Sequence, residues 1–475
     1  MSARDWLCLG CALTLISGCS VGPDYKPPTN PEGAEAPLVS LNDKAETSVE
    51  PPDDWWKLYQ DARLDALLRE AFTANADLAA AQANLTAASA LVAAAKAGRY
   101  PDTRIAAGGV RGRDAVTDEI LELGGHEPQT VWIIDDVLEV SYEVDLFGRV
   151  RRSVEASRAN AEAQAAARDS LKVVVAAETT RAYAQVCALG EQLAVARHSL
   201  EVVSREADIT SHRHEAGANS DFDVVRAEGL VAQTRAAIPP LEGQRRAALF
   251  QLTALLGRTP ANAPANMDAC VQPPTLAVLI PIGDGATLLK RRPDVRQADR
   301  LLASATARIG VATADLYPKI TLSGLYGGVA SDLSDLSNHT GLTWGIGPSI
   351  SWNLPNQALP RARVRQAKAV AAASLASFDS TVLTALKETE QALALYSAAL
   401  DQRQALADAQ SRAHQSFTMA HEQFLAGALS NLDLLTTEQV LVAADAAVAA
   451  SDSTLIQDQI AVFKALGGGW RTTAE

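Results

Sequence analysis

The chain has 475 residues, with 42 Lys and Arg against 56 Asp and Glu, which gives a formal net charge of −14 at pH 7. This acidic balance argues against a nucleic-acid-binding protein, because a phosphate-binding surface needs an excess of basic side chains. Hydrophobic residues make up 48% of the chain and aromatic residues only 5%. The apolar content comes mostly from Ala, Leu and Val, and alanine favours long, closely packed helices. Apolar residues recur throughout, which excludes extensive disorder. No charge-free run of 18 or more apolar residues follows residue 20, so a helical membrane bundle is not expected.

Residues 1–18 have the charge, apolar stretch and small residues of a secretory signal peptide. The sequence Ile-Ser-Gly-Cys at residues 16–19 resembles the bacterial lipobox, in which a peptidase cuts before a cysteine that carries lipid. The motif implies that Cys19 is the first mature residue and is acylated, which would anchor the chain stably. The alternative is an ordinary signal peptide with an incidental cysteine. Ser20 follows, where Asp would indicate retention in the inner membrane, so we expect the outer membrane of a Gram-negative bacterium.

The chain repeats itself at an offset of about 210 residues. Asn-Ala-Asp-Leu at 75–78 aligns with Arg-Pro-Asp-Val at 292–295, and Ala-Gly-Ala-Asn-Ser-Asp-Phe-Asp at 216–223 aligns with Ala-Gly-Ala-Leu-Ser-Asn-Leu-Asp at 426–433. Matches in the same order at nearly constant spacing indicate a tandem duplication, too long for a solenoid repeat. We therefore expect an acylated linker, a first repeat, a connector, a second repeat and a tail, at residues 19–60, 61–260, 261–285, 286–468 and 469–475.

Each repeat is predicted to contain a helix, two strands, a very long helix, a tight turn and a further helix. In the first repeat we expect the first helix at about 64–99 and the long helix at about 149–215. Apolar residues from Val186 to Val203 recur at alternating spacings of three and four, which is typical of a coiled coil. At about 1.5 Å per residue the long helix would reach roughly 100 Å. A purely structural coiled-coil spacer would also account for these helices.

Two segments, 138–146 and 343–354, alternate strictly between apolar and polar residues, with aromatic residues near their ends. This alternation is typical of transmembrane β-strands, although a soluble sandwich edge shares it. Segments 103–110 and 319–328 are weaker strand candidates, and the loops at 111–135 and 330–341 are polar. Four strands cannot close a barrel, and an open sheet edge in lipid leaves backbone groups without hydrogen bonds. Several copies of the chain must therefore share one barrel.

Two of the five cysteines, Cys187 and Cys270, lie in the mature body. In an oxidising compartment they either form a disulfide or remain two separate buried thiols. The sequence offers no Cys-x-x-Cys pair or His/Cys cluster for a metal. It also offers no credible Ser/His/Asp triad and no paired carboxylates in a pocket. We expect no enzyme and no cofactor apart from the lipid on Cys19.

Several motifs together indicate a family. Val-Gly-Pro-Asp-Tyr at 21–25 follows the lipobox, and Trp55-Trp56 precedes the motif at 75–78. The most specific motif is Pro-Ile-Gly-Asp-Gly at 281–285 with Leu-Leu-Lys-Arg-Arg-Pro-Asp-Val at 288–295, continuing to Ala-Asp-Leu-Tyr-Pro at 314–318. With these motifs the sequence resembles the outer-membrane factors of the TolC family, specifically the lipid-anchored efflux outlets of the OprM/NodT type. The resemblance implies an α+β membrane protein. Three protomers build a twelve-stranded outer-membrane β-barrel, four strands from each chain, on a long periplasmic α-helical coiled-coil tunnel.

The resemblance also implies a function and partners. Such a homotrimer is a passive outlet for small molecules, such as drugs and other toxic compounds. It docks on a periplasmic adaptor (membrane fusion) protein and an inner-membrane pump, commonly of the resistance-nodulation-division class. The first alternative is the outlet of a protein-secretion system, which uses the same fold. The second is a structural periplasmic lipoprotein that tethers the envelope layers.

The resemblance places adaptor docking at two helical turns, with matching residues Gly217, Ser220 and Asp223 in the first and Gly427 and Ser430 in the second. Local chemistry alone would also account for both turns, because Gly ends a helix and Ser caps the next one. Asp433 matches the position at which the second-copy helices of the family narrow the closed tunnel. Three copies of Asp433 would form an acidic ring that attracts cations. Relatives often carry a second acid one helical turn later, at the position of Thr436, so the ring here would be thinner.

Overall fold

The computed structural model describes residues 20–40, 46–47, 49–113, 119, 122–125, 127, 130–276, 278–283, 285–330 and 342–470. The signal peptide, Cys19 and nearly all of the loop expected at 330–341 lie outside these residues. The chain divides into two compact units. The first contains Leu85–Gln164 and Ala298–Phe378 with the described residues up to Pro28, and the second contains Thr29–Asn84, Ala165–Gln297 and the chain from Asp379 onward.

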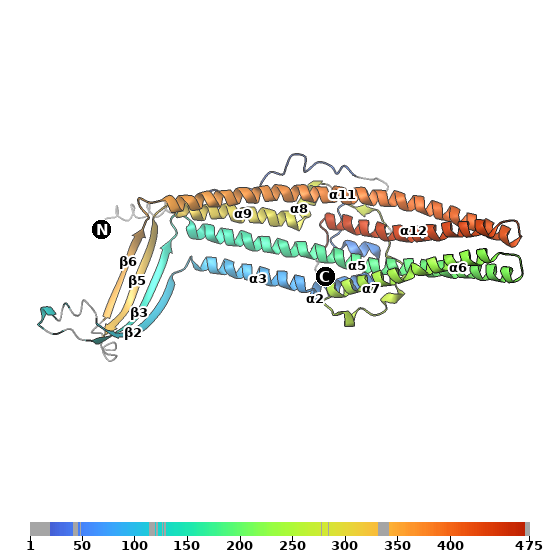
Figure 1. The fold of residues 1–475 in the computed structure, drawn as a ribbon. Helices are drawn as coiled ribbons and strands as arrows, with labels where there is room; N and C mark the ends of the chain where they lie inside the picture. Colours follow the sequence, from blue (N-terminus) through green and yellow to red (C-terminus); the bar gives the residue numbers. More distant parts are fainter. Residues whose placement is uncertain are drawn as a thin grey trace. The chain divides into compact units, whose positions relative to one another are not determined.

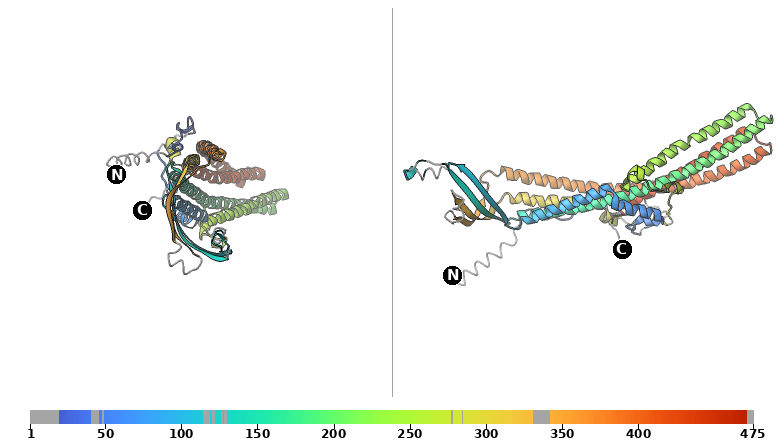
Figure 2. Two further views of the ribbon diagram at one scale, coloured as in Figure 1. Left: turned by 90° about the vertical axis from the view of Figure 1, so that its left-hand side faces the viewer. Right: turned by 90° about the horizontal axis from the view of Figure 1, so that it is seen from below.

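A four-stranded antiparallel sheet lies in the first unit, in the order β2-β3-β5-β6 (Figure 1). The strands span Asp102–Gly112, Val131–Val144, Lys319–Ala330 and Leu342–Ser351. Figure 2 shows that they curve together as one sheet. All four sequence candidates are therefore strands, but β3 begins at Val131, well before the alternating segment 138–146, and the loop expected at 111–135 is correspondingly shorter. The early part of β3 lacks alternation, and its pairing with β2, from Gly112 opposite Val131 onward, defines it as a strand.

Gly327 in β5 is explained by the close approach of the neighbouring strand β3. A Cβ on Gly327 would lie 2.0 Å from the carbonyl oxygen of Asp136 on the neighbouring strand. The Asp136 side chain also accepts a hydrogen bond of 2.9 Å from the backbone N–H of Gly328. Glycine in a strand interior often marks a site where another backbone comes close, and here it lets β3 and β5 pair.

The transition from β3 into α5 (Arg149–Glu215) is built by acidic side chains. Asp145 accepts hydrogen bonds from the backbone N–H groups of Val150 and Arg151, at 2.9 and 2.8 Å. This contact satisfies two of the N–H groups that a helix start leaves without partners. Arg149 donates to Glu143 at the end of the strand through two nitrogens, at 2.7 and 2.5 Å. These bonds fix the direction in which the helix leaves the sheet.

The second unit is mostly helical (Figure 1) and also holds the short parallel pair β1 (Glu46–Thr47) and β4 (Ile280–Pro281). It contains α2 (Ala62–Ala74), α6 (Asp221–Ala236), α7 (Ile238–Leu255), α8 (Gly285–Arg291) and α12 (Asn431–Ala465), with parts of α3 (Ala76–Ala97), α5, α9 (Pro293–Ala314) and α11 (Ala358–Leu425). Trp55 is 1% exposed and stacks on Phe463 with ring centroids 4.7 Å apart. The heptad seam predicted on α5 faces the interior, since Val186, Leu189 and Val203 are 1–2% exposed.

The single helix expected at 64–99 is in fact two helices, α2 and α3, because the helix is interrupted at Asn75. Asn75 has extended backbone dihedrals, and its side-chain oxygen accepts from the N–H groups of Asp77 and Leu78. Its side-chain nitrogen donates to the carbonyl of Leu255 at 3.0 Å. Asn75 therefore caps the start of α3 and also satisfies a carbonyl at the end of α7, which outweighs the helix-forming tendency of the alanines around it.

The same break recurs at the equivalent place in the second half of the chain. Arg292, 217 residues after Asn75, separates α8 from α9 and donates to the carbonyl of Ala465 at 2.8 Å. Leu255 is the last residue of α7 and Ala465 is the last residue of α12, and the two positions are 210 residues apart. The two halves thus use different side chains at one structural position to close equivalent helix ends.

The two halves differ in the helix that follows the tip. In the first half this helix ends at Ala236, and α7 starts with Pro239 and Pro240 in its first turn. In the second half α12 runs without a break from Asn431 to Ala465. Proline lacks the N–H that a continuous helix needs and is tolerated in a first turn, so the pair of prolines starts a new helix.

Among the described residues, three helices, α3, α11 and α12, are long and apolar enough to span a membrane when judged by length and composition. Alanine supplies much of this hydropathy, as in Ala76–Ala97. Alanine-rich helices are also expected in a closely packed coiled coil, so composition alone does not separate the two environments. The face of the sheet gives a more specific membrane signal.

Candidate functional site

One face of the sheet carries exposed apolar side chains. Ile105, Leu138, Tyr326 and Trp344 follow one another across the four strands in a single cross-strand row. Their exposed fractions run from 39% to 81%. Further exposed apolar residues of the same face are Val144, Leu322, Ile346 and Ile350. A continuous apolar surface of this kind marks contact with another protein or with lipid.

The opposite face and the edges of the sheet have a different character. Glu139, Ser141 and Thr343 alternate with the apolar residues and so point to the other side, as the sequence pattern predicts. That side is mixed rather than purely polar, because Leu325 and Val329 are also exposed on it. Within the described part of the chain, β2 and β6 are the outer strands, each paired on one side only. Their free sides present backbone N–H and C=O groups that lipid cannot satisfy.

The first tip turn joins α5 to α6 and lies in the second unit (Figure 1). Gly217 has a φ of +74°, and the N–H groups of Gly217 and Ala218 donate back to the carbonyls of His214 and Arg213, both at 2.8 Å. This pair of bonds is a Schellman ending, which favours glycine because the left-handed conformation costs it nothing.

Ser220 and Asp223 then start α6 as a reciprocal capping box. The Ser220 hydroxyl accepts from the N–H of Asp223 at 3.2 Å, and the Asp223 carboxylate accepts from the N–H of Ser220 at 3.1 Å. The hydrogen bond from the Ser220 hydroxyl holds the pKa of Asp223 below its usual range. Capping is therefore confirmed as the local role of this pair of residues.

The second tip turn, between α11 and α12, repeats this design. Gly427 has a φ of +75°, and the N–H groups of Gly427 and Ala428 donate to the carbonyls of Phe424 and Gln423 at 3.0 and 2.9 Å. Ser430 caps α12 by accepting from the N–H of Asp433 at 3.2 Å, and its hydroxyl donates to the Asp433 carboxylate at 2.6 Å.

The two turns lie at the same end of the second unit, and both views in Figures 1 and 2 agree on this. The Thr210 hydroxyl on α5 donates to the Asn431 side chain on α12 at 3.3 Å, and Arg213 donates to the carbonyl of Phe424 on α11. Asp433 is solvent-exposed in the single chain. The sequence-predicted tip residues therefore form one surface.

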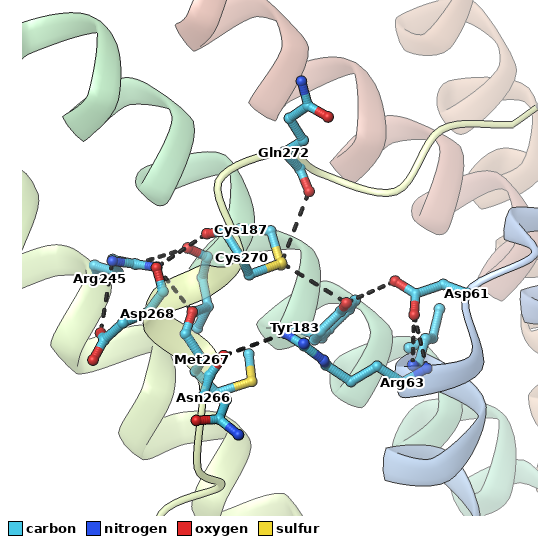
Figure 3. Close-up of a disulfide and its surroundings, with 12 residues drawn as sticks. Asp61, Arg63, Tyr183, Cys187, Arg245, Asn266, Met267, Asp268, Cys270 and Gln272 are labelled. Carbon is cyan, nitrogen blue, oxygen red and sulfur yellow. Dashed lines mark hydrogen bonds and ion pairs between the residues drawn. A yellow bond between two sulfur atoms is a disulfide. The ribbon is translucent and has the colours of Figure 1, made fainter. Parts of the chain in front are cut away.

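Cys187 and Cys270 are joined by a disulfide, which resolves the alternative that the sequence left open (Figure 3). The bond ties the connector between the two halves to α5. Arg245 on α7 donates to the carbonyls of Met267 and Cys270 at 2.9 and 3.0 Å. A Cβ on residue 190 would lie 2.1 Å from the carbonyl oxygen of Cys270, which explains the glycine there within a long helix.

One pair of buried acidic side chains is not among the residues predicted from the sequence. Glu206 on α5 and Glu438 on α12 are buried near the tip, with exposed fractions of 6% and 0%. The nearest buried residues on each helix are uncharged, among them Val203 and Thr210 around Glu206 and Leu435 and Leu441 around Glu438. A charged residue at an apolar position of the helical pattern was the available signal. Without the structure, nothing in the sequence brings the two helices together at these residues.

Comparison with known proteins gives consistent matches along the chain. A family model described as outer membrane efflux protein matches residues 67–258 and 286–468. Nodulation protein T of Rhizobium leguminosarum bv. viciae is 31% identical over 460 residues, covering 96% of this chain and 92% of that protein. The probable efflux pump outer membrane protein TtgC of Pseudomonas putida is 28% identical over 474 residues, covering 98% and 96%. The solved outer-membrane channel OprN has a TM-score of 0.85 at 33% identity, covering 95% of this chain and all of that one.

Proposed function

The chain belongs to the outer membrane efflux protein family, and from this premise we propose that it is the passive outer-membrane channel of a tripartite efflux system. The protein lies in the outer membrane of a Gram-negative bacterium and extends into the periplasm. It would carry small molecules, including drugs or other toxic compounds, from the periplasm or an inner-membrane pump to the exterior. The apolar face of the sheet is the observation that carries this proposal, because a membrane channel needs a lipid-facing wall.

A barrel shared by three copies accounts for the sheet edges. Each chain supplies four strands, and the free sides of β2 and β6 need partners in a membrane. Three chains would pair β6 of one protomer with β2 of the next and close a twelve-stranded barrel. The two family matches and the recurring break at Asn75 and Arg292 support the tandem duplication.

The tip turns would receive the periplasmic adaptor. Gly217, Ser220, Asp223, Gly427 and Ser430 hold both turns in one rigid conformation by local hydrogen bonds, which a docking surface requires. The adaptor would open the channel by binding the open state more tightly than the closed one. Asp433 of three protomers would form the acidic constriction. At the other end of the chain, lipid on Cys19 would add a second attachment to the outer membrane.

Single-channel conductance of the detergent-purified mature protein in a planar bilayer tests the proposal, together with its mass in detergent. We expect a trimeric mass and discrete, cation-preferring current steps that grow in Asp433→Ala. Asp223→Ala is the matched control, because it removes the same charge and the same contact with a capping serine from the other turn. Equal effects of the two substitutions would move the constriction away from Asp433. Silence together with a monomeric mass would reject the shared barrel and favour a structural tether.

A further inference from the structure

Two buried acidic side chains, Glu206 on α5 and Glu438 on α12, lie close enough to interact electrostatically behind the tip turns. Glu438 is fully buried, and neither of its carboxylate oxygens has a hydrogen-bond partner in the described part of the chain. Glu206 is 6% exposed, and one of its oxygens is likewise without a partner there. Burying a carboxylate without hydrogen bonds costs several kcal/mol when it is ionised, and two such groups repel each other.

The surroundings of the pair contain few opposite charges. On α11, the Nδ1 atom of His421 lies 3.2 Å from Glu206. On α5, Arg213 is the second cation that acts on Glu206, although its guanidinium also donates to the carbonyl of Phe424. The nearest side of α6 contributes the uncharged residues Ala227 and Leu230. No cation within the described residues acts on Glu438, and the charged group that acts on it is Glu206.

Both carboxyl groups therefore favour the protonated form. Burial, with Glu206 nearby, raises the pKa of Glu438 to about 7. Burial also raises the pKa of Glu206, while His421 and Arg213 partly oppose the rise. Because the two groups interact, they titrate as a pair. Near neutral pH the packed arrangement holds a proton that the two carboxylates would release if α12 moved away from α5 and water reached them.

We propose that Glu206 and Glu438 form a proton-operated latch that holds the tip end of α12 against α5. With the pair protonated, α12 packs on α5 through Leu435, which clusters with Val203 and Ala207. With both groups ionised, repulsion and desolvation favour separation of the α11–α12 turn from the α5–α6 turn. Since Glu438 lies five residues after Asp433, the latch would bias the opening of the proposed constriction, and in that respect it rests on the proposed function.

The direction of the pH dependence follows from the raised pKa. Between the ordinary range of a carboxyl group and about pH 7, the packed arrangement binds more protons than the separated one. Raising the pH through this range therefore weakens the packing, by up to tenfold in the opening equilibrium for each pH unit and each linked proton. Below this range both arrangements are protonated and the packing keeps its full stability.

The chain contains a matched control for this pair. Glu228, 210 residues before Glu438, lies in α6 at the equivalent distance from its own tip turn, but it is exposed. The position in the second half that corresponds to Glu206, 210 residues later, is Ser416, so Glu228 has no acidic counterpart there. The buried carboxylate pair thus belongs to the second half of the chain, and Glu228→Gln removes a charge at the same helical position without touching the pair.

Hydrogen exchange on the full-length protein in detergent tests the latch without requiring a conducting channel. After correction for the intrinsic pH dependence, amides at the start of α12 should exchange up to tenfold faster per pH unit between pH 5 and 7. Glu438→Gln should weaken this dependence and raise the protection of α12 at pH 7.5, the double variant with Glu206→Gln should abolish it, and Glu228→Gln should leave it unchanged. Glu206→Gln alone provides a second single variant with the result expected for Glu438→Gln.

A wild-type protein without this pH dependence, or a double variant of Glu206→Gln and Glu438→Gln that retains it, would overturn the latch. Conductance then tests the link to opening: the fraction of time open should rise between pH 5.5 and 7.5 in the wild type and not in the double variant. If exchange behaves as expected but the protein forms no channel, the latch stands and the proposed function fails. If the protein conducts but exchange shows no linked proton, the function stands and the latch fails.

Discussion

A bulky residue at either tip glycine should weaken export and leave assembly intact. Gly427 has a φ of +75°, and a Cβ built on it meets no atom within 4 Å. The cost of Gly427→Val therefore comes from backbone strain, which is about 1–2 kcal/mol for an L-residue in the left-handed conformation. The same reasoning applies to Gly217, with a φ of +74° and equally open surroundings.

That strain is confined to the turn, and its energy is small compared with the packing energy of the second unit. If the adaptor recognises the native turn, a cost of 1–2 kcal/mol weakens docking by roughly 5–30-fold. The assay measures the binding of purified adaptor to the trimer, followed by drug susceptibility of cells that carry each variant. Gly229→Ala is the control, because Gly229 lies inside α6 without a positive φ and a Cβ there also meets open space.

Three results would test this reasoning separately. Weaker docking at unchanged trimer mass and unchanged melting temperature is the expected outcome for Gly427→Val. Unchanged docking and export in both tip variants would refute the assignment of the turns to the adaptor. Loss of the trimer would show that the turns have a role in assembly that local strain does not explain.

Two further predictions concern stability. Arg292→Ala should lower the free energy of unfolding of the second unit by about 2–4 kcal/mol, because it removes the guanidinium that donates to the carboxylates of Asp294 and Glu388 and leaves the Ala465 carbonyl with only the longer bond from Thr389. Arg292→Lys should recover part of this loss in urea unfolding, since lysine keeps the charge but not the planar fork. An equal loss of unfolding free energy in Arg292→Ala and Arg292→Lys would show that packing of the side chain, and not its charge, stabilises the unit. Replacing Cys187 and Cys270 by Ser should lower the melting temperature, because the disulfide closes a loop with a sequence separation of 83, for which chain entropy gives about 4.5 kcal/mol. An unchanged melting temperature of the double variant, compared with the wild type under oxidising conditions, would count against that estimate.

The sequence predicts the long elements well because their patterns are long. The bounds expected for α5, 149–215, are those of the structure, since its periodicity continues over many turns and a Schellman glycine follows its end. The alternation in 138–146 likewise places Leu138 and Glu139 on opposite faces of the sheet. In both elements a short pattern of apolar and polar residues recurs many times, so the local sequence is enough to predict the element.

The features that the sequence did not predict depend on contacts between distant segments. The break between α2 and α3 combines a local cap by Asn75 with a bond from the same side chain to Leu255, 180 residues away. The early start of β3 depends on pairing with β2, where local alternation is absent. The disulfide required the connector to fold back onto α5, which neither cysteine reveals.

The differences between the two halves are as informative as their likeness. Both tip turns have the same Schellman ending and the same serine cap, so a docking partner would meet two similar rigid turns. Behind the turns, however, Glu438 is buried against Glu206, while the equivalent Glu228 is exposed. If the packing of α12 depends on a proton, the second tip turn and the start of α12 can move together as one rigid unit. The second half of the chain is thus the half in which a change at the turn, or a change of pH, would be transmitted to Asp433.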